Sequence, residues 1–189
     1  MSDFDKNLVI ISGPSGTGKD TITQRLLAID NRFALSVSAT TRQPRAGEED
    51  GVDYYFISEE DFSKKIENGD FIEYARYGKN YYGTLKQDVE NRIKSGKTVI
   101  LVIDVQGEAN IKKLYPKVLS IFVMPPSYEI LEKRLRGRNT DSEDAILLRL
   151  EAAKCEMEKC GEYDYVVVND SLETAVDDAY KIITEHISK

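Results

Sequence analysis

Histidine, cysteine and long apolar runs are nearly absent from this 189-residue chain. The single histidine is His186, so a mechanism built on an interior histidine, such as a Ser-His-Asp triad, is disfavoured. Cys155 and Cys160 are too few for a disulfide framework, and with one histidine they provide no zinc site. No run approaches the ~18 apolar residues of a membrane span. The polar, acidic first residues do not resemble a signal peptide, and we therefore expect a cytoplasmic protein.

Positive charge is also in short supply. The chain has 26 basic and 33 acidic residues, which gives a formal net charge of −7. This balance disfavours a non-specific nucleic-acid binder, which usually has a basic excess. We expect no nucleic-acid partner and no membrane partner, although a local basic pocket for a small polyanion remains compatible with the sequence.

Five short apolar segments predict buried strands. Several are continuous β-branched runs, which are typical of parallel strands covered on both faces. Helical patterns lie between them, such as Ile22, Leu26 and Ile29 after the first segment. This alternation predicts a doubly wound α/β core of one domain. The five segments are Leu8–Ile11, Ala34–Val37, Thr98–Ile103, Val118–Met124 and Tyr165–Val168.

Two stretches interrupt this alternation. Residues 38–84 are rich in Gly, Tyr, Arg and Asp and contain short strand-like pieces, so they predict an inserted subdomain with its own small sheet. Residues 131–149 are arginine-rich and broken by Gly137, so they predict an exposed, movable helical segment. Three patterns resemble helix caps: Thr84-x-x-Gln87, Thr140-x-x-Glu143 (for a helix to about Cys160) and Asp170-x-x-Glu173.

A phosphate-loop motif is the strongest chemical feature. Residues 13–19 read Gly-Pro-Ser-Gly-Thr-Gly-Lys between a predicted strand and a predicted helix, which is the context that this motif requires. The glycines Gly13, Gly16 and Gly18 allow the backbone amides to approach a polyphosphate closely. Lys19 adds a positive charge for the β- and γ-phosphates. The motif predicts ATP binding by Gly13, Pro14, Ser15, Gly16, Thr17, Gly18, Lys19, Asp20 and Thr21.

The residue after the lysine departs from the general motif. Asp20 stands where Ser or Thr usually helps to hold Mg²⁺. Two interpretations remain open: Asp20 or Thr21 holds the metal, in part through water, or Asp20 is a favourable charge in the first turn of a helix.

A second anion site is indicated by Arg42 and Arg45, which flank Pro44. Proline restricts the backbone, and a fixed pair of guanidinium groups suits a dianionic phosphate. Tyr54 and Tyr82 are candidate hydroxyl donors. The alternative is a solvated basic loop.

Taken together, these segments closely resemble those of guanylate kinases over nearly the whole chain and in the expected order. The resemblance is carried by 38–48, 51–54, 71–74, 80–84, 104–107, 137–140 and 168–170. It implies a phosphate-loop kinase core with a five-stranded parallel sheet flanked by helices, an inserted GMP-binding subdomain with a small mixed sheet, and a helical lid. The implied limits are 1–37, 86–128 and 159–189 for the core, 38–85 for the subdomain and 129–158 for the lid.

The same resemblance implies transfer of the γ-phosphoryl group of ATP to GMP (dGMP included) with Mg²⁺, in purine nucleotide metabolism. It assigns catalytic roles to Lys19, Arg45, Arg138 and Arg149, and the adenine side of ATP to Asn169. It assigns GMP binding to Ser38, Arg42, Arg45, Glu48, Tyr54, Glu73, Tyr82, Thr84 and Asp104. Water-mediated Mg²⁺ binding is expected near Asp20, Thr21 and Asp104.

Two departures from the family pattern bear on the metal. Asp20 replaces the usual small or hydroxyl residue, and Val102 stands where the family usually has a second acid before Asp104. We hypothesise that the Asp20 carboxylate compensates for the missing acid at position 102.

Three rival functions share some of these sequence features. An inactive kinase-like interaction module would show damage to the phosphate loop or lid arginines, yet Lys19, Arg138 and Arg149 are present. A ribose 1,5-bisphosphate kinase would explain Gly-Lys-Asp in the loop but not the segment 38–48 together with Glu73. An adenylate-type kinase would lack the guanine-reading acid.

Overall fold

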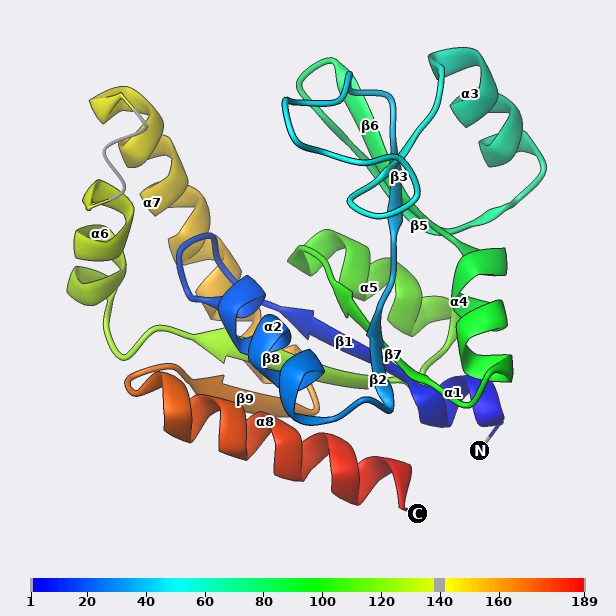
Figure 1. Ribbon diagram of the computed structural model, residues 1–189. Coiled ribbons are helices and arrows are strands. Elements are labelled where there is room, and N and C mark those ends of the chain that lie inside the picture. The colour runs from blue at the N-terminus through cyan, green and yellow to red at the C-terminus, as the bar shows by residue number, and fades with distance from the viewer. Residues whose placement is uncertain (1, 138–141, 189) are drawn as a thin grey trace.

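The computed structural model describes residues 2–137 and 142–188 and contains two sheets. The predicted fold class is confirmed: a five-stranded parallel sheet forms the core, and a four-stranded mixed sheet stands apart from it (Figure 1). Arg138 and Thr140 lie outside the described residues. Among the helices that are described, none has the length and apolarity that crossing a membrane would require.

The central sheet has the strand order β2-β7-β1-β8-β9, and every neighbouring pair is parallel. All five predicted strands are present, with small shifts at their ends. Pro125 and Pro126 follow the fourth one, as expected from their inability to extend a ladder. The bounds are β1 Leu8–Ser12, β2 Phe33–Leu35, β7 Thr98–Val102, β8 Leu119–Met124 and β9 Tyr165–Val168.

Strand β1 is buried on both faces because successive side chains point to opposite sides of the sheet. Val9 and Ile11 pack with α2 (Lys19–Ile29) and α8 (Leu172–Ile187). Leu8 and Ile10 pack instead with α1 (Asp3–Asn7), α4 (Lys86–Lys94) and α5 (Val105–Leu114). This placement fixes β1, and therefore the loop that follows it, in the centre of the molecule.

Strand β9 corrects one prediction. Its apolar run was expected to be covered on both faces, but Tyr165, Val166 and Val168 are 43%, 44% and 48% exposed. Val167 is buried. β9 lies at the edge of the sheet beside β8, where packing on one face is sufficient for a short strand. A continuous apolar run therefore did not distinguish an edge strand from a central one.

The smaller sheet has the order β4-β3-β6-β5 and contains the predicted inserted strands. Phe62 on α3 (Glu59–Glu67) packs on Phe71 and Tyr81 and gives this unit a core of its own. The Ser58 hydroxyl caps α3 by accepting from the Asp61 amide. The strands are β3 Ser38–Thr40, β4 Tyr55–Phe56, β5 Phe71–Tyr77 and β6 Asn80–Leu85.

A helical pair stands on the other side of the phosphate loop from the small sheet (Figure 1). It consists of α6 (Tyr128–Arg136) and α7 (Glu143–Met157), followed by a short 3-10 helix, Glu158–Glu162. The two helices share a small apolar cluster that includes Leu131, Leu135, Ile146 and Leu150. The loop of β1 therefore lies between two separately packed units.

The predicted caps are wrong at the helix starts that are described. Helix α7 is capped by Ser142 and α8 by Ser171, whose hydroxyl groups accept from backbone amides in the first turn. Thr84 lies in β6, and Leu85 precedes α4 without a side-chain cap. In the first two cases a serine nearer to the helix satisfies the amides. In the third case the Thr84 hydroxyl has a different partner, Glu73.

Candidate functional site

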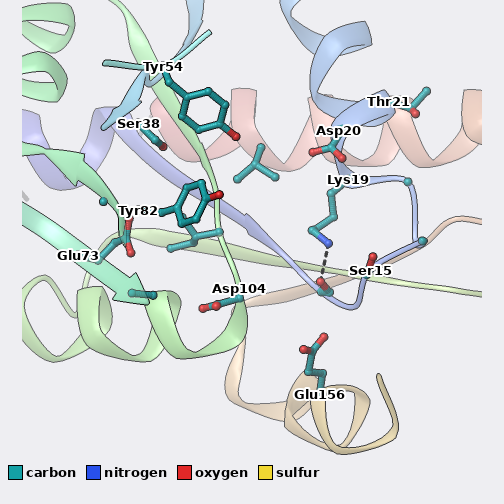
Figure 2. Close-up of a pocket in the computed structure, with 17 residues that line it drawn as sticks. Ser15, Lys19, Asp20, Thr21, Ser38, Tyr54, Glu73, Tyr82, Asp104 and Glu156 are labelled. Atoms are coloured by element: carbon teal, nitrogen blue, oxygen red, sulfur yellow. Dashed lines mark hydrogen bonds between the residues drawn. The ribbon is translucent and has the colours of Figure 1, made fainter. Parts of the chain in front are cut away.

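One cavity of about 550 Å³ joins the phosphate loop to the small sheet. Figure 2 shows its lining side chains converging from β1–α2, from the small sheet, from the end of β7 and from α7. The predicted site residues that line it are Gly13, Ser15, Gly16, Gly18, Lys19, Asp20, Thr21, Ser38, Tyr54, Glu73, Tyr82 and Asp104. Residues far apart in the sequence thus surround one volume suitable for a nucleotide-sized ligand.

The phosphate loop runs from the end of β1 into the first turn of α2. Gly13 and Gly18 adopt positive φ angles of 135° and 93°, which side chains other than glycine rarely tolerate. The Lys19 ammonium donates to the carbonyl oxygens of Gly13 at 2.6 Å and Pro14 at 2.9 Å. These bonds fold the lysine back over the loop, so its charge lies where phosphates would be held.

Asn169 supports this loop from behind. Its side-chain amide donates to the Thr17 carbonyl at 2.7 Å, and the residue is 6% exposed. Its own backbone carbonyl accepts from Arg134 at 2.9 Å. Thr17 is fully buried and its hydroxyl donates to the Pro14 carbonyl. These hydrogen bonds hold the loop in shape. The described lining of the cavity does not include Asn169, Thr17 or Pro14.

Three polar side chains of the small sheet share one register. Ser38 on β3 is opposite Thr84 on β6, and Thr84 is opposite Glu73 on β5. The Thr84 hydroxyl donates to Glu73 Oε1 at 2.7 Å. Cross-strand pairing therefore brings together three residues that the sequence separates by up to 46 positions, and it orients the carboxylate.

Burial raises the pKa of Glu73, the Thr84 hydrogen bond opposes this rise, and the negative charge of Asp104 adds to it. Asp104 caps α5, where its Oδ1 accepts from the Gly107 amide at 2.7 Å. A side-chain carbon at Gly107 would stand 3.4 Å from both Asp104 Oδ1 and Glu73 Oε2. Gly107 therefore lies in van der Waals range of both carboxylates at this wall of the cavity.

The arginine pair is held by Glu48. Arg42 donates to both carboxylate oxygens of Glu48, at 2.8 and 3.0 Å, and Glu48 also accepts from the Arg45 amide at 2.7 Å. These hydrogen bonds raise the pKa of Arg42 and lower that of Glu48. Arg42 also lies over the rings of Tyr54 and Phe56. Glu48 thus fixes Arg42 and the turn that carries Arg45, whose side chain is exposed.

Tyr54 and Tyr82 meet edge to face, with ring centroids 6.2 Å apart. Both line the cavity, and the Arg42 guanidinium lies 5.4 Å from the centroid of the Tyr54 ring. Burial raises the pKa of Tyr54, and the neighbouring Tyr82 raises it further. Tyr54 therefore keeps its phenolic proton at neutral pH and can donate it to an anion.

Asp20 and Val102 face the same space. Both line the main cavity and both line an adjoining cavity of about 290 Å³. Within residues 2–137 and 142–188, no three acidic, histidine or cysteine side chains are grouped tightly enough to hold a metal alone. Oxygen donors from Asp20, Thr21 and Asp104 around one cavity nevertheless suit Mg²⁺, which usually keeps several waters and binds through one or two carboxylates plus substrate phosphates.

Only one of the two predicted lid arginines lies in the part of the chain that the structure describes. Arg149 is exposed on α7 and is absent from the described lining, and Arg138 lies outside the described residues. Conversely, the structure adds Glu156, near the end of α7, to the lining. No sequence motif pointed to Glu156, because its place in the cavity depends on the path of α7 back towards the loop.

Comparison with known proteins agrees with this geometry. A family profile described as guanylate kinase matches residues 5–186. A guanylate kinase of Synechocystis is 49% identical, covering 94% of this chain and 93% of its own length. One of Rickettsia felis is 46% identical, covering 100% and 99%. The crystal structure of guanylate kinase from Anaplasma phagocytophilum superposes with a TM-score of 0.74 at 36% identity, covering 96% of this chain and 86% of that one. With its phosphate loop and a buried acid facing each other across one cavity, this chain belongs to the guanylate kinase family.

Proposed function

We propose that this protein transfers the γ-phosphoryl group of ATP to GMP, giving ADP and GDP. The observation that carries the proposal is the register of Ser38, Thr84 and Glu73, which faces the phosphate loop across the 550 Å³ cavity. A carboxylate accepts hydrogen bonds only, and guanine presents two adjacent donors, N1–H and the 2-amino group. Adenine presents a lone pair at the first of these positions, so Glu73 favours guanine.

ATP binds with its phosphates on the loop of residues 13–19. Loop amides and the amino end of α2 surround the β- and γ-phosphates, and Lys19 exchanges its carbonyl partners for phosphate oxygens. Asn169 acts on this side by holding the Thr17 carbonyl.

GMP binds with its phosphate near Arg42, Arg45, Tyr54 and Tyr82. Arg42 is already oriented by Glu48, and Tyr54 carries a protonated hydroxyl, so little reorganisation is needed on binding. Glu48 acts through Arg42 rather than on the anion, since a carboxylate would repel a phosphate. Recognition then uses the base and the phosphate, and dGMP is accepted as well.

Phosphoryl transfer requires alignment and charge stabilisation more than covalent chemistry from the protein. The GMP phosphate is itself an anionic nucleophile at neutral pH, so no general base is assigned. The core (1–37, 86–128, 159–189) carries ATP, the subdomain 38–85 carries GMP, and the lid 129–158 closes over both. Closure brings Arg149 and Arg138 to the transferring phosphoryl group and excludes water.

Mg²⁺ is the metal that fits this donor set. Asp20, Thr21 and Asp104 would hold its waters while the ATP phosphates provide direct ligands. When bound, the ion would neutralise negative charge on the ATP phosphates. Because Val102 supplies no carboxylate, the Asp20 side chain takes over part of this role.

Coupled ADP-release assays with GMP, AMP and ribose 1,5-bisphosphate as acceptors test the proposal. The expected result is rapid ADP release when GMP is the acceptor and slow release with the other two acceptors. Preference for ribose 1,5-bisphosphate would support the sugar-phosphate kinase instead, and no release with any acceptor would support an interaction module.

A further inference from the structure

Glu156 is a cavity residue without an evident structural reason for its position. It lies in the last turn of α7, where the helix dipole disfavours a negative charge. Its side chain is partly buried, and it accepts no hydrogen bond from residues 2–137 or 142–188. Burial raises the pKa of Glu156; the charge of Lys19 lowers it and that of Asp104 raises it further. Its place at the carboxyl end of a helix, its burial and the nearby Asp104 charge all disfavour the charged form, and such costs concentrate at functional sites.

The other carboxylates of the cavity are accounted for. Glu73 is held by Thr84, Asp104 caps α5 through the Gly107 amide, and Asp20 lies in the first turn of α2 where the dipole favours it. Figure 2 shows Glu156 on the side of the cavity away from the small sheet, with its carboxylate directed towards the loop beneath Lys19.

The charge of the lining has a consequence for the phosphate donor. Among the described lining residues, one lysine faces four carboxylates, Asp20, Glu73, Asp104 and Glu156. A negative field of this kind opposes a bare triphosphate more than a triphosphate neutralised by a divalent cation, because the interaction scales with the ligand charge. Glu156 has neither a helix amino end, as Asp20 and Asp104 have, nor a hydroxyl donor, as Glu73 has. The positive charges that act on it are those of Lys19 and Lys159.

We propose that Glu156 is a specificity-determining residue that makes the cavity reject metal-free ATP in favour of metal-complexed ATP. The carboxylate does not contact the metal in this scheme. It imposes a penalty on each unneutralised phosphate charge near Lys19, and the cation removes most of that penalty. The inference rests on the proposed binding of ATP at the phosphate loop.

Equilibrium binding, measured by calorimetry without GMP, tests the inference independently of turnover. Dissociation constants for ATP with EDTA and for ATP with saturating Mg²⁺ are compared at about pH 8, several pH units above the ordinary pKa of a glutamate. The variants are Glu156→Gln, Glu156→Asp and the matched control Glu151→Gln, an exposed acid on the same helix. The quantity compared is the ratio of the metal-free to the metal-complexed dissociation constant.

Glu156→Gln is expected to lower this ratio about tenfold, mainly because the dissociation constant of metal-free ATP falls. Without the cation, ATP carries about two more negative charges, and these lie a few ångströms from the carboxylate in a partly solvated site. Glu156→Asp and Glu151→Gln should keep the wild-type ratio. An unchanged ratio in Glu156→Gln, an equal fall in Glu151→Gln, or a rise in Glu156→Gln overturns the inference. Lys19→Ala distinguishes failure of the proposed ATP site from failure of this inference. Normal ATP affinity in Lys19→Ala refutes the phosphate-loop assignment itself. Weakened ATP affinity in Lys19→Ala, together with an unchanged ratio in Glu156→Gln, refutes the inference alone.

Discussion

Replacing Glu73 by glutamine should convert a guanine-reading acid into a group that tolerates adenine. The carboxylate has one oxygen engaged by Thr84 at 2.7 Å and lies in a buried position that raises its pKa. Both guanine donors can therefore bind a charged acceptor in a site of low dielectric. Glutamine offers one neutral acceptor oxygen and places a donor against a guanine donor.

The expected loss is large. Exchanging one charge-assisted pair for a donor–donor contact costs about 2–4 kcal/mol, which corresponds to roughly 30- to 1000-fold in kcat/KM for GMP. The glutamine amide can instead donate to adenine N1 and accept from its 6-amino group, so AMP use should improve. The GMP/AMP ratio of kcat/KM should fall by about two to three orders of magnitude or more.

Steady-state kinetics with both acceptors provide the measurement. Glu67→Gln, an exposed acid in the same subdomain, is the matched control and should leave the ratio unchanged. The ratio should also depend on pH in the wild type: it should fall as pH falls through the raised pKa of Glu73, because protonation removes the charged acceptor. Titration of the substrate phosphate cancels, since both acceptors carry it. If the GMP/AMP ratio of kcat/KM in Glu73→Gln equals the wild-type ratio, Glu73 does not read the base.

Stability provides the control for misfolding. A carboxyl whose pKa is raised by folding contributes stability below its unfolded pKa of about 4.3 and loses it as pH rises through the folded value. At neutral pH the buried charge is therefore a cost, and Glu73→Gln should unfold at the same temperature as the wild type or higher. A markedly lower Tm would attribute any kinetic loss to packing instead.

Three further predictions concern the phosphate side. Lys19→Ala should lower kcat by at least ~100-fold with an unchanged circular dichroism spectrum, because the lysine stabilises charge on the β- and γ-phosphates; near-normal turnover would refute the loop assignment. Arg149→Ala and Arg138→Ala should lower kcat by ~10- to 1000-fold with little change in the Kd of GMP, because lid contacts form mainly in the transition state; a loss confined to GMP affinity would exclude a lid role. Asp20→Ser should shift the free Mg²⁺ needed for half-maximal rate, and Val102→Asp should partly reverse the shift; additive effects in the double variant would refute compensation.

The sequence by itself determined the parallel core and the phosphate loop. Strand β1, the loop and α2 are contiguous, so spacing, glycine positions and the apolar run contain all the information that this local motif needs. Family resemblance extended the prediction to Glu73 and assigned Tyr54 and Tyr82, which were already candidate hydroxyl donors, to GMP. All three line the cavity.

Only the tertiary structure decided how distant residues combine. Thr84 resembled a helix cap in the sequence, but strand pairing directs its hydroxyl to Glu73. Glu48 stays a predicted GMP-site residue, and the structure shows that its oxygens accept from Arg42 and the Arg45 amide. Glu156 had no local pattern at all. Such contacts depend on strand register and on how separate units pack against each other. Neither is encoded in the spacing of neighbouring residues.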